Sequence, residues 1–123
     1  MLARIEGSQV RCFTRNGNDW SSKMPSLVKD LLSLGLSSAW LDGEIVVPGA
    51  NGMPDFQALQ NAFDGRHTEA LQYFVFDLPF FAGYDLRNVP LQERRAVLSA
   101  LIGESTPPSI RYSEISMRRS TSY

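Results

Sequence analysis

Alternation of apolar and polar residues predicts most of the strands in this chain. Two short β-rich runs, Leu2–Ile5 and Gln9–Thr14, flank the pair Gly7-Ser8. Glycine at the first position of a two-residue loop is typical of a type II′ turn, because that position has a positive φ angle. We therefore expect residues 1–14 to form a β-hairpin.

Two longer runs and one short run have the composition of further strands. Trp40–Val47 ends at Pro48-Gly49, and Leu71–Leu78 is rich in tyrosine, phenylalanine and valine. Aromatic and β-branched residues favour strands. Ser109–Tyr112 is a third candidate, whereas Pro79–Asn88 is expected to be a loop.

Three segments have the spacing of helices. They are Pro25–Leu34, with leucines three or four residues apart, a short helix capped by Asp55, and Pro90–Ile102, which begins at a proline and ends before a glycine. Arg94 and Arg95 of the last helix are expected to lie on its solvated face. The order of helices and strands favours an α/β or α+β layered domain.

Composition limits the classes of function. Hydrophobic residues make up 43% of the 123 residues, charged residues 20%, and the net charge is −1, which is typical of a soluble globular chain. Binding to nucleic acid would need a local basic surface, because the chain has no bulk positive charge. One cysteine excludes a disulfide within the chain and fits a reducing cytoplasm. No run approaches the roughly 20 apolar residues of a membrane span, and Ser116–Tyr123 is expected to be disordered.

The pair Asp42 and Glu44 is the sharpest candidate for chemistry. In a strand these two carboxylates point to the same face, and Gly43 between them leaves room on the other face for a close backbone approach. A hard cation such as Mg²⁺ or a ribose would satisfy two such acids. A solvated strand face, or one acid paired with an arginine, is the alternative.

Aromatic and basic residues supply two further candidates. Phe74 and Phe76 share one face of their strand, where an exposed ring can stack on a base. Arg15 follows a strand in a loop rich in glycine and asparagine, where its guanidinium can bind a phosphate. Core packing of the phenylalanines and an ordinary surface arginine remain the alternatives.

Taken in order, these segments resemble the ligase domain of the bacterial DNA ligase D family, ATP-dependent DNA ligases of end joining. Phe13–Gly17 is similar to motif Ia of that family, Leu41–Val46 to motif III and Phe74–Leu78 to motif IIIa, while Asp55–Asn61 and Pro90–Arg95 are also typical of it. The resemblance covers residues 1–115. It implies an α+β fold, part of the DNA ligase and mRNA capping enzyme nucleotidyltransferase domain (ATP-grasp-like), with a mostly antiparallel sheet and flanking helices.

The resemblance also implies roles for particular residues. Glu44 would hold the ribose hydroxyls of ATP or help to place a metal ion, with Asp42 as a supporting acid, and Phe76 would stack on adenine, with Phe74 as its alternative. Arg15 would contact a DNA phosphate. The cofactors implied are ATP and Mg²⁺ or Mn²⁺. The partners implied are nicked or broken double-stranded DNA, with Ku and the polymerase domains of a parent protein, in the bacterial cytoplasm at the nucleoid and away from membranes.

The chain also departs from the family pattern. The nucleophilic Lys-x-Asp-Gly motif would fall just before Met1, and two later lysine motifs and an OB-fold would follow Ile115. Lys23 and Lys29 are the only lysines, and both are expected on the surface. We therefore expect residues 1–115 to be a partial adenylation domain without a catalytic lysine, and residues 116–123 to be a tail foreign to the family. The alternatives are a non-enzymatic remnant or partner-binding module of a truncated gene, and an RNA ligase or capping enzyme, which no RNA-specific feature supports.

Overall fold

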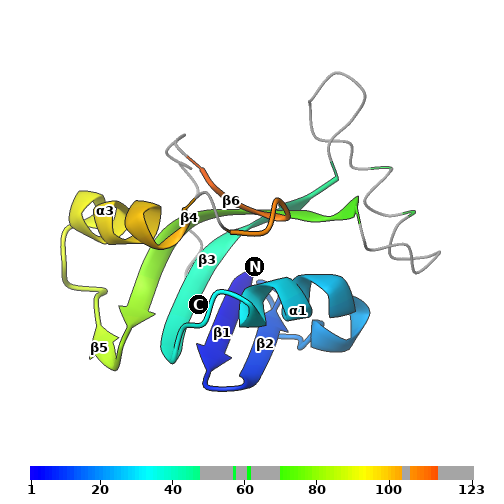
Figure 1. The fold of residues 1–123 in the computed structure, drawn as a ribbon, viewed down its shortest axis with the longest axis horizontal. Coiled ribbons are helices and arrows are strands. Elements are labelled where there is room, and N and C mark those ends of the chain that lie inside the picture. Colours follow the sequence, from blue (N-terminus) through cyan, green and yellow to red (C-terminus); the bar gives the residue numbers. More distant parts are fainter. Residues whose placement is uncertain (48–56, 58–60, 62–69, 104–105, 114–123) are drawn as a thin grey trace.

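In the part of the chain that the computed structural model describes, residues 1–47, 57, 61, 70–103 and 106–113, six strands form one sheet. The strands run in the order β2-β1-β3-β4-β5, and β6 pairs with β4 (Figure 1). All pairs are antiparallel except β4 with β6. The elements are β1 Leu2–Glu6, β2 Gln9–Phe13, the 3-10 turn η1 Ser21–Lys23, α1 Pro25–Leu32, β3 Ser38–Val46, β4 Gln72–Phe81, β5 Tyr84–Asp85, α3 Leu91–Leu101 and β6 Ile110–Tyr112. This arrangement confirms the predicted α+β class with a mostly antiparallel sheet.

The first hairpin has the predicted turn. Glu6 and Gln9 are the last paired residues of β1 and β2, so two residues connect the strands. Gly7 has a φ of +61°, while Ser8 keeps a negative φ. A positive φ at the first position only is the mark of a type II′ turn.

The end of β4 differs from the sequence-based expectation. The strand continues through Pro79 to Phe81 and turns back at Ala82-Gly83 into β5, so the prediction of a loop over Pro79–Asn88 was wrong in its first half. The reason is a β-bulge, because two residues of β4, Leu78 and Pro79, lie opposite Leu41 alone. A bulge tolerates proline, which has no N–H to donate to the ladder.

The helices lie close to their predicted places. α1 ends two residues before the predicted end, and α3 starts and ends one residue inside its predicted range. The short helix expected after Asp55 lies outside the described residues except for Gln57 and Asn61, which are helical. The tail at 116–123 also lies outside them. Within the described residues, no helix is long and apolar enough to cross a membrane.

One face of the sheet, here called the core face, holds the hydrophobic core. Every strand except the short β5 contributes buried side chains to it, and both helices add leucines to the same cluster, so α1 and α3 cover the same face (Figure 1). The cluster consists of Ala3, Ile5, Val10, Cys12, Met24, Leu27, Leu31, Ala39, Leu41, Leu71, Tyr73, Val75, Leu78, Leu98 and Ile110. Burying this much apolar surface supplies the main stabilising free energy of the fold.

The opposite face, here called the open face, carries the residues that alternate with those of the core. None of them belongs to the core cluster: Arg4, Phe13, Trp40, Asp42, Glu44, Phe74, Phe76 and Phe80. A row of aromatic and cationic side chains crosses it. Arg4 Cζ lies 5.0 Å from the ring centre of Trp40, whose own ring lies 4.1 Å from that of Phe80. Such cation–π and ring contacts stabilise a sheet face on which neither α1 nor α3 packs.

Candidate functional site

Asp42 and Glu44 lie on the open face of β3, as predicted. Leu41 beside them is in the core, while the Glu44 side chain is exposed and Asp42 is 4% exposed. The Cα partner of Glu44 on β4 is Phe74. The two acids therefore project beside an aromatic residue of the neighbouring strand.

Gly43, between the two acids on β3, allows β4 to come close. A Cβ atom at this position would lie 2.2 Å from the Phe74 carbonyl oxygen and 2.8 Å from Cε1 of Tyr73. The Tyr73 hydroxyl lies 2.8 Å from the carbonyl oxygen of Leu41, beneath the glycine. The expectation of a close backbone approach at Gly43 is thus confirmed, and the approach fixes the spacing of Glu44 and Phe74.

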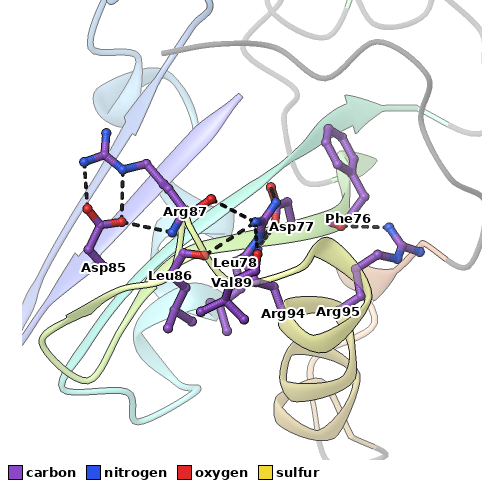
Figure 2. A network of polar contacts seen from close by, with 9 residues as sticks. All are labelled: Phe76, Asp77, Leu78, Asp85, Leu86, Arg87, Val89, Arg94 and Arg95. Atoms are coloured by element: carbon purple, nitrogen blue, oxygen red, sulfur yellow. Dashed lines mark hydrogen bonds and ion pairs between the residues drawn. The ribbon is translucent and has the colours of Figure 1, made fainter.

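Phe76 lies in a second β-bulge. Gly43 pairs with Val75 and Asp42 with Asp77, so Phe76 has no partner of its own on β3. The side chain is 8% exposed but lies outside the core cluster. Its ring extends away from α3 (Figure 2). Phe74 and Phe76 thus accompany Glu44 on the open face.

Arg15 is the remaining predicted site residue. It is exposed, in the turn after β2. Burial lowers the pKa of the Met1 amino group below its ordinary value, the charges of Asp42 and Glu44 act to raise it, and Arg15 acts to lower it. The charges of Asp42, Glu44 and Arg15 therefore all act on the Met1 amino group.

The expectation that Arg94 and Arg95 form a solvated helix face was wrong. Arg94 pairs with Asp77 at 2.8 Å, with side-chain exposures of 14% and 20%, and Arg95 donates to the Phe76 carbonyl at 2.7 Å (Figure 2). Their spacing from Leu98, four and three residues, places all three on one side of the helix. That spacing is the sequence signal by which both arginines could have been placed against the sheet.

Two other features of the site bear on ligands. Among the described residues, no three of the His, Cys, Asp and Glu side chains gather closely enough to hold a metal ion. A small pocket of about 190 Å³ lies on the open face over β1 and β2, lined by Arg4, Glu6, Gln9, Arg11 and Phe13. It contains none of the four predicted site residues.

Among the described residues, α1 and α3 pack on one face of the mostly antiparallel sheet, and two acids and two phenylalanines lie on the other. The profile of the family described as "ATP dependent DNA ligase domain" matches residues 1–122. The chain belongs to the ATP-dependent DNA ligase domain family.

Relatives found by sequence similarity are also ligases or ligase-like proteins. The chain is 50% identical over 113 residues to the multifunctional non-homologous end joining protein LigD of Pseudomonas aeruginosa, covering 92% of this chain and 14% of that protein. It is 33% identical over 101 residues to LigD of Mycobacterium tuberculosis, covering 82% and 13%. It is also 33% identical over 96 residues to the SPbeta prophage-derived DNA ligase-like protein LigB of Bacillus subtilis, covering 76% and 34%.

Two solved structures have the same fold. One is mycobacterial DNA ligase D complexed with ATP and MES, with a TM-score of 0.72 and 30% identity, covering 92% of this chain and 36% of that one. The other is the ligase domain of M. tuberculosis LigD, with a TM-score of 0.70, 28% identity and the same coverage. The chain thus spans part of a ligase nucleotidyltransferase domain and about a seventh of the P. aeruginosa protein.

Proposed function

We propose that the open face of β3 and β4 contributes the ribose and adenine contacts of an ATP-dependent DNA ligase domain. The observation that carries the proposal is the pairing of exposed Glu44 with Phe74 across β3 and β4, with Phe76 two residues further along the same strand. A carboxylate accepts hydrogen bonds from two ribose hydroxyls, and a phenylalanine ring stacks on a purine. The likeness to a ligase D solved with ATP supports the same assignment.

The family uses ATP with a divalent metal ion, and this segment fits part of that requirement. Carboxylate oxygens are the ligands that Mg²⁺ and Mn²⁺ take. Glu44, with Asp42 beside it, supplies oxygens of that kind, but the described residues hold no third ligand nearby. Glu44 would supply one carboxylate to such an ion, and the described residues alone would not complete its coordination.

Arg15 is the proposed contact to the phosphate backbone of nicked or broken double-stranded DNA. Its exposed guanidinium lies in a turn and acts on the same point as the two acids. An arginine offers two parallel N–H donors to a phosphate. We propose Ku and polymerase domains as partners, because the relatives are end-joining proteins. We propose that they act with this chain in the bacterial cytoplasm, at the nucleoid.

We propose further that the 123-residue chain does not adenylate itself. A lysine nucleophile must be desolvated and placed in line with the α-phosphate. Lys23 and Lys29 are both exposed, Lys23 lies 4.4 Å from the Trp20 ring centre, and Lys29 is on α1, which packs on the core face. An exposed lysine is not desolvated, so we infer that neither lysine serves as the nucleophile and that this chain holds the nucleotide without attacking it.

Titration of the ¹⁵N-labelled chain with ATP and Mg²⁺, followed by NMR, tests the binding proposal. We expect amide shifts to change along β3 and β4, and Glu44→Gln and Phe76→Leu to weaken binding by about ten-fold, the typical effect of losing one charged hydrogen bond or one stacked base. Glu93→Gln, an exposed acid on α3, and Phe80→Leu, on the same strand and face, are the matched controls. Equal losses in the controls, or no shifts in β3 and β4, would contradict the assignment.

Incubation with radiolabelled ATP and Mg²⁺, followed by a denaturing gel, tests the second proposal. We expect no labelled band and no sealing of nicked DNA. A labelled band that disappears in Lys23→Ala or Lys29→Ala would show that the chain carries its own nucleophile.

A further inference from the structure

The bulge that carries Phe76 changes which residues of β4 face the core. Tyr73 and Val75 belong to the core cluster, and regular alternation would put Asp77 there next. After the bulge, Leu78 takes that place instead. A carboxylate in the core would cost several kcal/mol unless it were paired, and the bulge avoids that cost. The Asp77 side chain is still only 20% exposed, so its charge needs a partner.

Arg94 is that partner, and it uses its whole guanidinium. Its Nε donates to Asp77 Oδ1 at 2.8 Å and its Nη2 to Oδ2 at 3.2 Å. Its Nη1 donates to the carbonyl of Val89 at 2.5 Å, with the carbonyls of Leu86 and Arg87 at 3.4 and 3.3 Å (Figure 2). One planar side chain therefore ties the bulge to the loop between β5 and α3.

Arg95 holds the other side of the same bulge. Its Nη1 donates to the Phe76 carbonyl at 2.7 Å, and its Nη2 donates to the Ser113 carbonyl just after β6. Its guanidinium also lies 5.1 Å from the ring centre of Tyr112. A bulged residue is displaced from the regular ladder, and here a charged side chain supplies a donor to its carbonyl.

We infer that Arg94 and Arg95 are positioning residues that fix the backbone of Phe76 and Asp77, so that the Phe76 ring is presented on the open face for a purine base. This inference rests on the proposed function, since Phe76 is the residue assigned to adenine there. A side chain already held in its binding orientation loses less conformational entropy when the ligand arrives. α3 packs on the core face, but through Arg94 and Arg95 it holds the backbone of Phe76, whose side chain lies on the open face.

The geometry requires arginine at both positions. A guanidinium binds a carboxylate through two parallel N–H groups and still has donors for carbonyls. A lysine keeps the positive charge but has a single nitrogen, so it cannot reach Asp77 and the loop carbonyls in the same arrangement. We call the contacts of Arg94 and Arg95 with the bulge the clamp. Arg94→Lys and Arg95→Lys therefore remove the clamp while leaving the net charge unchanged.

Hydrogen exchange of the intact chain tests the clamp without any ligand. In Arg94→Lys and in Arg95→Lys we expect the amides from Val75 to Leu78 to exchange about ten-fold faster, the effect of losing one charged hydrogen bond. The amides of β1, which is paired on both sides, serve as the internal reference. Arg111→Lys, an exposed arginine on β6, is the matched control. Unchanged exchange in the bulge, or an equal rise in β1, would overturn the clamp.

ATP binding by the same variants tests the positioning role. We expect Arg95→Lys to weaken the binding of ATP and Mg²⁺ several-fold, and the double variant Arg95→Lys/Phe76→Leu to bind no more weakly than Phe76→Leu alone, because residues that act through one another are not additive. Additive losses, or unchanged binding in Arg95→Lys, would overturn positioning. If the unaltered chain binds no ATP, the proposed function fails, while the exchange result still decides whether the clamp exists.

Discussion

The two faces of the sheet differ in residue type and in burial. The core face is mostly aliphatic and buried, and α1 and α3 cover it, with Leu98 and Leu31 among its fully buried side chains. The open face alternates with it along the same strands but carries acids, arginines and aromatic rings, and Glu44 on it is exposed. Side chains on the core face therefore supply most of the stability, whereas an exposed side chain on the open face such as Glu44 can be changed at little cost in stability.

The largest effect is expected at Gly43, where β3 and β4 come closest to each other's backbone. In Gly43→Ala the new Cβ would meet the Phe74 carbonyl oxygen, a backbone atom, at 2.2 Å. We expect the free energy of unfolding to fall by about 3 kcal/mol or more, since overpacking against backbone has no cheap relaxation. Urea unfolding measures the change. Gly103→Ala, with no atom within 4 Å of the added Cβ, is the control, and a similar loss there would refute the explanation.

Matched substitutions on the two faces should differ in their effect on stability. Leu98→Ala empties a fully buried position and should lower the free energy of unfolding by about 3 kcal/mol. Glu44→Gln on the open face should change it by less than about 0.5 kcal/mol. Both values come from the same urea titrations. If Glu44→Gln proved as destabilising as Leu98→Ala, the open face would be a second core and the division would be wrong.

Cys12 gives the core face a dependence on pH. Burial raises the pKa of its thiol from an ordinary 9.0 to about 12, and the side chain is 0% exposed. The folded state thus keeps the proton between about pH 9 and 12 while the unfolded state loses it, so stability should fall as pH rises through this range. The fall between pH 8 and 10.5 should be smaller in Cys12→Ala, which removes the thiol but leaves the tyrosines and lysines. An identical fall in both proteins would show that Cys12 does not contribute.

The smallest expected effect on the free energy of unfolding is in the turn between β4 and β5. Ala82 has a φ of +53° and Gly83 one of +86°. A left-handed conformation costs a non-glycine residue about 1 kcal/mol, so Ala82→Gly should raise the free energy of unfolding by up to that amount. Gly83→Ala should lower it. A thermal melt of the two variants decides, and the reverse order would contradict the assigned turn.

The sequence predicted the regular parts of this fold well. Alternation located the strands around Leu41 and Val75, and helical spacing located both described helices. It also placed Asp42 and Glu44 on one face, because the extra residues of both bulges lie on β4 and not on β3.

The parts that the sequence did not predict depend on the bulges in β4. A bulge is a relation between two strands, so the pattern of one strand does not reveal it. The extension past Pro79 and the partly buried pairing of Arg94 with Asp77 both follow from such bulges. The roles of Glu44, Phe76 and Arg15 came from family resemblance and remain predictions.

Transfer of nuclear Overhauser effects from bound ATP tests the central claim most directly. With ATP and Mg²⁺ at saturating concentration, the adenine H2 and H8 protons should show contacts to the ring of Phe76, and the ribose protons should show contacts to the side-chain protons of Glu44. Phe76→Leu should remove the ring contacts and leave the ribose contacts to Glu44 unchanged. Adenine contacts confined to α1 or α3 on the core face would contradict the account.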